Sequence, residues 1–213
     1  ADGIPLHTRG YGRSSAKNGE VFEWVFNYPA NYWDAASVAI KHLLDENGGD
    51  LSGKDITLLY HNSAYGKEPI RTLEDLSEKH GYNLSTIAVD HPGQEQKSQW
   101  LRIRRERPDY VIMWGWGVMN QVAIQEAANV RFPMENFIGN WWAGAEHDVT
   151  PAGDAADGYK ALNMNRIADY PVFDDIQEYV VDAGLAAGDG SNVGKVLYTR
   201  GMYAAMLAVE AAK

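Results

Sequence analysis

The sequence predicts an α/β protein built on a doubly wound parallel sheet. Between residues 56 and 139, short apolar stretches alternate with amphipathic ones, and glycine or proline follows most of the amphipathic stretches. Strands that alternate with helices at this spacing form βαβ units. The chain has 213 residues, of which 45% are hydrophobic and 23% charged. It is therefore long and apolar enough to bury a substantial core.

The individual elements follow from local patterns. The helix predicted over 31–46 carries an apolar stripe at helical spacing, and Gly48-Gly49 ends it. Gly81 closes the next helix, and Pro108 stops the one after. The predicted strands are 3–8, 21–26, 56–60, 84–89, 110–114 and 136–139, with 159–164 as a further candidate. The predicted helices are 31–46, 68–80, 96–105, 119–130, 172–183 and 198–212.

Composition excludes several classes of function. The net charge is -10, whereas a nucleic-acid-binding protein normally presents a basic face. The one basic cluster, Arg102 to Arg107, is interpreted as a solvated helix end. The absence of cysteine excludes disulfides, thiolate metal sites and cysteine nucleophiles. No apolar run approaches the roughly 18 to 20 residues that a membrane span needs.

Aromatic residues gather where predicted strands end. Ligands of doubly wound sheets bind outside the carboxyl ends of the strands. His61 and Tyr65 follow the strand over 56–60, Trp114 and Trp116 end the strand over 110–114, and Trp141 and Trp142 follow the strand over 136–139. Such rings can form an apolar pocket wall, although packing within the core is an alternative for each. For His61, a structural hydrogen bond to a neighbouring loop is the alternative to ligand contact.

The motifs of catalysis and cofactor binding are absent or incomplete. Gly48 to Lys54 spells G-x-x-x-x-G-K, but it precedes a strand and Asp55 replaces the required Ser or Thr. Gly115-Trp116-Gly117 follows a strand, yet Asn120 stands where a dinucleotide fingerprint has its third glycine. No G-x-S-x-G or H-E-x-x-H is present. The sequence therefore predicts binding rather than catalysis, with no cofactor and no metal.

The order of these motifs resembles a known family. Ile56 to Gly66 (ITLLYHNSAYG) is similar to the strand and loop that open the second lobe of type I periplasmic binding proteins of ABC transporters, in the branched-chain amino acid (Leu/Ile/Val) group. Phe26 to Pro29 resembles that family's crossover between lobes, and 155–159 resembles its return segment. Tyr198 to Ala212 is similar to its late helix. Each motif is weak alone, and their order and spacing carry the resemblance.

The resemblance implies a ligand site between two lobes of flavodoxin-like fold. The family's loop tyrosine falls on Tyr65, and its pocket aromatic falls on Trp116, with Trp114 nearby. Gly10, Tyr11 and Gly12 match the first lobe's ligand loop. Trp141 stands where amino-acid binders place the carboxylate that holds the ligand's ammonium. Burying an unpaired ammonium is costly, so an apolar or aromatic ligand is expected instead, with or without a carboxylate.

The resemblance also implies an organisation and a setting. Residues 31–158 match a complete second lobe, while 1–30 and 159–213 match a crossover and parts of the first lobe, so a fragment is expected. The expected partners are a small-molecule ligand and the permease subunits of an ABC transporter, and the expected location is periplasmic. Two alternatives are a ligand-sensing domain of a receptor or regulator, and a nucleotide-dependent doubly wound enzyme.

Overall fold

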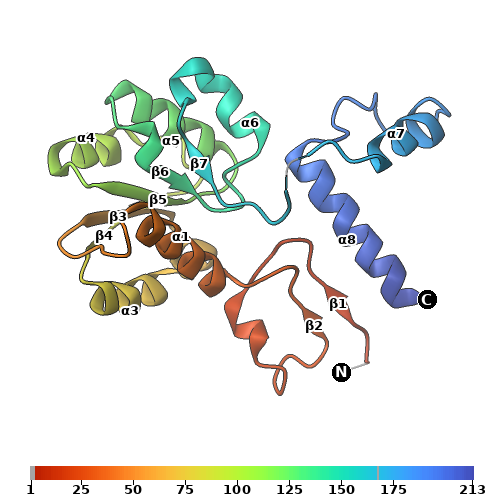
Figure 1. The fold of residues 1–213 in the computed structure, drawn as a ribbon, viewed down its shortest axis with the longest axis horizontal. Coiled ribbons are helices and arrows are strands. Elements are labelled where there is room, and N and C mark those ends of the chain that lie inside the picture. The colour runs from red at the N-terminus through yellow and green to blue at the C-terminus, as the bar shows by residue number, and fades with distance from the viewer. Residues whose placement is uncertain (1–2, 167) are drawn as a thin grey trace.

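A five-stranded parallel sheet forms the centre of the protein (Figure 1). The computed structural model describes residues 3–166 and 168–213, so Ala1, Asp2 and Ile167 of the predicted first-lobe segments lie outside the described residues. The sheet has the strand order β4-β3-β5-β6-β7, and every neighbouring pair is parallel. Its strands are β3 (Asp55–His61), β4 (Asn83–Val89), β5 (Tyr110–Trp114), β6 (Phe137–Gly139) and β7 (Lys160–Ala161).

Helices cover both faces of this sheet, which confirms the doubly wound fold (Figure 1). On one face, α1 (Tyr32–Glu46) and α3 (Ile70–His80) pack against Ile112 and Trp114 of β5. On the other face, α4 (Lys97–Glu106) and α5 (Val118–Asn129) pack against Val111 and Met113 of the same strand. All five residues of β5 are buried because alternate side chains point to the two helical layers.

The helix boundaries follow local chemistry. Asn31 caps α1 by accepting hydrogen bonds from Trp33 and Asp34, and Gly81 ends α3 in the left-handed conformation. The helix expected over 68–80 begins two residues later, at Ile70, and a separate short helix, α2 (Ala64–Lys67), precedes Pro69. Proline has no N–H to continue a helix and is tolerated only at its start, so α3 begins at Ile70.

The first and last segments of the chain lie to one side of the sheet (Figure 1). β1 (Leu6–His7) and β2 (Val25–Phe26) form a small parallel pair, shorter than the strands expected over 3–8 and 21–26. The helix expected over 172–183 is formed by α7 (Val172–Ile176), which continues as the π-helix η4 (Gln177–Val181). The long helix α8 (Val196–Ala212) closes the chain. Short irregular helices connect the elements: η1 (Ser14–Lys17), η2 (Met134–Asn136), α6 (Glu146–Val149) and η3 (Thr150–Ala156).

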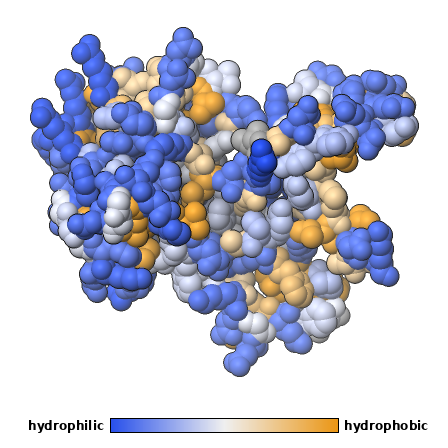
Figure 2. Space-filling model, in the orientation of Figure 1, coloured by the Kyte–Doolittle hydropathy of each residue, from blue (hydrophilic) through white to orange (hydrophobic). Residues whose placement is uncertain are grey.

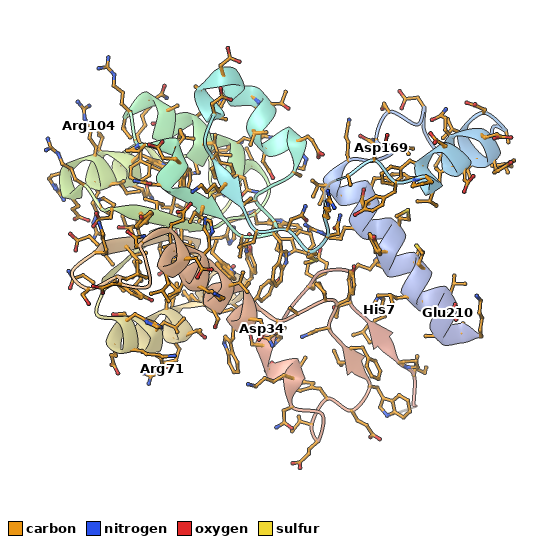
Figure 3. The ribbon with its side chains drawn as sticks, in the orientation of Figure 1. His7, Asp34, Arg71, Arg104, Asp169 and Glu210 are labelled. Carbon is orange, nitrogen blue, oxygen red and sulfur yellow. The ribbon has the colours of Figure 1, made fainter. Side chains whose placement is uncertain are left out.

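Exposed apolar side chains mark the outer elements. Leu6 of β1, Phe26 of β2, and Leu207 and Val209 of α8 are all exposed, and Figure 2 shows hydrophobic residues on this side of the molecule. By contrast, Arg71 and Arg104 point outward from α3 and α4 (Figure 3). β7 begins two residues after the expected end of the second lobe at 158. The division into lobes remains a prediction.

Candidate ligand-binding site

A cavity of about 330 Å³ lies at the carboxyl-terminal edge of the central sheet. The loops that follow β3 and β5, the loop that follows β6, and the segment around residue 11 all contribute to it. Parallel strands present their carboxyl ends at one edge, which brings these distant loops together. The lining residues are Tyr11, Arg13, Tyr32, His61, Ser63, Ala64, Tyr65, Glu68, Trp116 and Trp142.

Three aromatic rings form one wall of this cavity. The Tyr11 ring centre lies 5.0 Å from that of Trp142 and 6.2 Å from that of Trp116. Trp116 and Trp142 meet at 5.1 Å in an edge-to-face arrangement. Tyr11 is 55% exposed and Trp116 is 42% exposed. Much of this ring surface is therefore open to a ligand, and aromatic faces favour flat apolar or aromatic groups.

Hydrogen bonds fix the second wall, formed by Tyr32 and Tyr65, whose ring centres are 5.1 Å apart. The Tyr65 hydroxyl donates to the Gly115 carbonyl oxygen at 2.9 Å and accepts from the Asn140 side-chain amide. It thereby links the loops after all three central strands. Burial raises the pKa of Tyr65 well above its usual value, so this hydroxyl stays protonated and remains a donor.

Trp142 is held at both its backbone and its ring. Its N–H donates to Asn140 Oδ1 at 3.0 Å, and its carbonyl oxygen accepts from Asn120 Nδ2 at 2.7 Å. Its indole Nε1 donates to the Tyr32 hydroxyl at 3.1 Å. Asn120, which disqualifies the dinucleotide fingerprint, therefore helps to position a cavity tryptophan.

Trp114 and Trp141 lie behind the cavity wall instead of lining it. Trp114 is fully buried in the core, and its ring meets that of Tyr32 at 6.0 Å. Trp141 is 5% exposed, stacks on Tyr32 at 5.3 Å, and donates from Nε1 to the Gly10 carbonyl oxygen at 3.0 Å. Of the predicted site residues, the structure brings Tyr11, His61, Tyr65 and Trp116 together on the cavity. A ligand role for any of them remains a prediction.

Gly10 and Gly12 also lie beside the cavity without lining it. A Cβ atom on Gly12 would lie 2.8 Å from the Ala30 carbonyl oxygen and 3.0 Å from the Trp141 ring. Gly10 has a φ of +100°, a conformation that side chains rarely adopt. Both glycines therefore allow the first segment to pass close to Trp141, which positions Tyr11 between them.

Charged and polar groups line the cavity from three segments. Arg13 is exposed, and its Nε donates to Ser15 Oγ at 2.9 Å. Glu68 Oε2 accepts from the backbone N–H of Ser14 at 3.3 Å. His61 Nε2 lies 3.4 Å from His91 Nδ1. Burial, and secondarily His91, lowers the pKa of His61, so the neutral imidazole is favoured.

Several cavity residues were not assigned a ligand contact from the sequence. Trp142 is adjacent to the predicted Trp141, and only the direction of the chain after β6 decides which indole reaches the cavity. Arg13 and Glu68 belong to segments without a ligand-binding motif. Their one signal is closeness to predicted site residues, since Arg13 follows Gly12 and Glu68 follows Tyr65 by three positions. Among residues 3–166 and 168–213, no group of three potential metal ligands is found.

The sequence matches one protein family over residues 1–213, the family described as periplasmic binding protein. This chain belongs to that family. The fold and the predicted resemblance are thereby confirmed. A search of the curated proteins returned no match.

Solved structures give the same result. An ABC transporter permease from the Pseudomonas fluorescens group is 40% identical, with a TM-score of 0.89, over 99% of this chain and 52% of its own. A branched-chain amino acid ABC transporter protein from Thermus thermophilus with bound valine is 19% identical, with a TM-score of 0.81, over 98% of this chain and 53% of its own. A solute-binding protein from R. palustris in complex with benzoate is 21% identical, with a TM-score of 0.71, over 97% of this chain and 54% of its own. The chain thus spans about half the length of these proteins.

Proposed function

We propose that this chain is part of the solute-binding component of an ABC transporter and binds a small solute in the cavity between Tyr11 and Tyr65. The carrying observation is the cavity itself, where five aromatic residues converge at the sheet edge from five separate segments. Membership of the periplasmic binding protein family supports a solute-binding role. The related structures are binding proteins rather than enzymes, which favours binding over the nucleotide-dependent alternative.

The proposed solute has a flat aromatic or apolar body and an anionic group. Tyr11, Trp116 and Trp142 would contact the body, and Arg13 would hold the anion. The R. palustris relative was solved with benzoate, a solute of this kind. Glu68 lines the same cavity and could instead pair with an ammonium, so an amino acid is the competing ligand.

The proposed setting follows from the family. We place the protein outside the cytoplasm, where it would deliver its solute to permease subunits. Residues 31–158 would form the second lobe, with 1–30 and 159–213 contributing to the first. The lobes would close by hinge motion near Tyr28-Pro29 and Gly158. Within the described part of the chain, no helix has both the length and the apolar character needed to cross a membrane.

A calorimetric titration tests the ligand class. Benzoate, benzamide, phenylalanine and valine are added separately to the chain, and heat release is measured. We expect benzoate to bind more tightly than valine, because its ring would pack against the aromatic wall and its carboxylate would pair with Arg13. Binding of valine and phenylalanine with no response to benzoate would contradict the proposed ligand class and would favour a role for Glu68.

Trp116→Ala tests the location of the site. Removing this ring should weaken benzoate binding about tenfold, because one aromatic contact and its buried area are lost. Trp33→Ala is the matched control, since Trp33 is similarly exposed but lies on α1 outside the cavity. Equal affinities for the wild type and both variants would place the site elsewhere.

A further inference from the structure

Arg200 lies directly behind the tryptophans that follow β6. This residue belongs to α8 and is only 3% exposed. Its Nη2 donates to the Trp141 carbonyl oxygen at 2.7 Å, and its guanidinium carbon lies 5.0 Å from the centre of the Trp142 ring. Arg200 does not line the cavity, yet it contacts the ring that does. It therefore couples the late helix to the wall of the proposed site.

The charge of Arg200 has no counter-ion among the described residues. No salt bridge to it is found within 3–166 and 168–213, and its Nε and Nη1 are buried without a hydrogen-bond acceptor in that part of the chain. Two titratable groups, Tyr28 and Tyr32, act electrostatically on Arg200, and both are neutral phenols at physiological pH. Burial lowers the pKa of Arg200, but an arginine begins so far above neutrality that it remains charged.

A buried, unpaired cation projects its potential into its surroundings. Aromatic rings screen charge poorly compared with water, so the field of Arg200 extends through Trp142 toward the cavity. A cation already over the Trp142 ring also reduces the attraction of that ring for a second cation. Arg13 adds a positive charge at the cavity, whereas Glu68 opposes it.

We infer that Arg200 is a specificity-determining residue that selects anionic over neutral or cationic solutes from behind the Trp142 ring. The inference rests on the proposed aromatic-solute site and adds a residue from a distant helix to it. A unit charge roughly 10 Å away, at an effective dielectric constant of about 20, changes an affinity by roughly tenfold. Arg200 is thus expected to contribute about this factor to the preference for an anion.

Calorimetry with two isosteric probes, benzoate and benzamide, tests the inference. Both probes are titrated into the wild type, Arg200→Gln and Arg200→Lys. Glutamine removes the charge and keeps an amide that can donate to Trp141, while lysine keeps the charge. We expect Arg200→Gln to lose about tenfold in benzoate affinity with benzamide unchanged, and Arg200→Lys to retain most of the preference. Circular dichroism confirms that each variant is folded.

Three results would overturn the inference. If Arg200→Gln weakens both probes equally, Arg200 only supports the fold of the wall. If Arg200→Gln changes neither probe, Arg200 plays no part in selection. If Arg200→Gln does not fold, a variant of the exposed residue Arg13 provides the second test. Complete loss of the preference for benzoate over benzamide in Arg13→Gln would show that Arg200 contributes nothing to that preference. Failure of the wild type to bind either probe would instead reject the proposed function itself, and the inference with it.

Discussion

Two groups of aromatic rings pack at the same spacing but differ in what surrounds them. In the core group, Trp100 of α4 and Phe137 of β6 have ring centres 5.1 Å apart and are fully buried. In the cavity group, Trp116 and Trp142 lie 5.1 Å apart, yet Trp116 is 42% exposed. Ring spacing alone therefore does not distinguish a structural cluster from a binding surface. Exposure does.

The two groups are also held in place by different interactions. Trp100 and Phe137 pack in a cluster of buried apolar side chains, and the Trp100 indole also donates to Gln96 Oε1 at 3.4 Å. Around the cavity, Tyr65 donates a hydrogen bond to Gly115 and Trp142 donates one to Tyr32. Hydrogen bonds can fix a side chain from its polar end and leave its face free. The core group should therefore carry stability, and the cavity group should carry binding.

The largest expected effect comes from Trp100→Ala. Removing a fully buried ring should destabilise the protein by about 3–5 kcal/mol, because apolar contacts are lost and a cavity remains. The measurement is the free energy of unfolding in urea. Leu101→Ala is the matched control, since Leu101 is the next residue of α4 and is 59% exposed. Equal losses in the two variants would show that Trp100 is not a main stabilising residue of this cluster.

A smaller effect is expected from Tyr65→Phe. The change leaves the Asn140 amide and the Gly115 carbonyl without this partner, which should cost about 1–3 kcal/mol of unfolding free energy. Ligand affinity should fall as well, because Asn140 also positions Trp142. Tyr60→Phe serves as the control, since the Tyr60 hydroxyl forms no hydrogen bond within the described residues. A Tyr65→Phe variant as stable as Tyr60→Phe would mean that the network contributes little.

The central strand of the sheet could be predicted from the sequence far better than the cavity group. β5 is a continuous apolar run from Tyr110 to Trp114, bounded by Pro108-Asp109 and Gly115, so its burial on both faces follows from composition and local breakers. The same reasoning predicts that Tyr65 and Trp116 lie at one edge of the sheet, where both line the cavity, because both follow strands whose carboxyl ends share that edge.

The cavity details depend on contacts that no local pattern contains. Tyr65 bonds to residues 50 and 75 positions away. After β6, backbone geometry turns Trp142 into the cavity and Trp141 toward Gly10, although the two residues are chemically identical. Arg200 reaches the same place from α8, 59 residues from Trp141. Long-range placement of this kind appears only in the folded structure.

The smallest expected effect concerns the pH dependence of stability near His61. Burial, and then His91, lowers the pKa of His61 in the folded protein. The unfolded chain therefore binds a proton more readily, so the contribution of His61 to stability is fully present above the ordinary histidine pKa of about 6.5 and declines as the pH falls below it. The decline between pH 7.5 and 5.5 should be less than the roughly 1.4 kcal/mol that one pKa unit represents.

Urea unfolding at these two pH values compares the wild type with His61→Asn and with His80→Asn, a control at the end of α3 outside the cavity. His61→Asn should lose less stability on acidification than the wild type, and His80→Asn should behave like the wild type. If His61→Asn loses as much unfolding free energy on acidification as the wild type, protonation of His61 does not contribute to the pH dependence of stability.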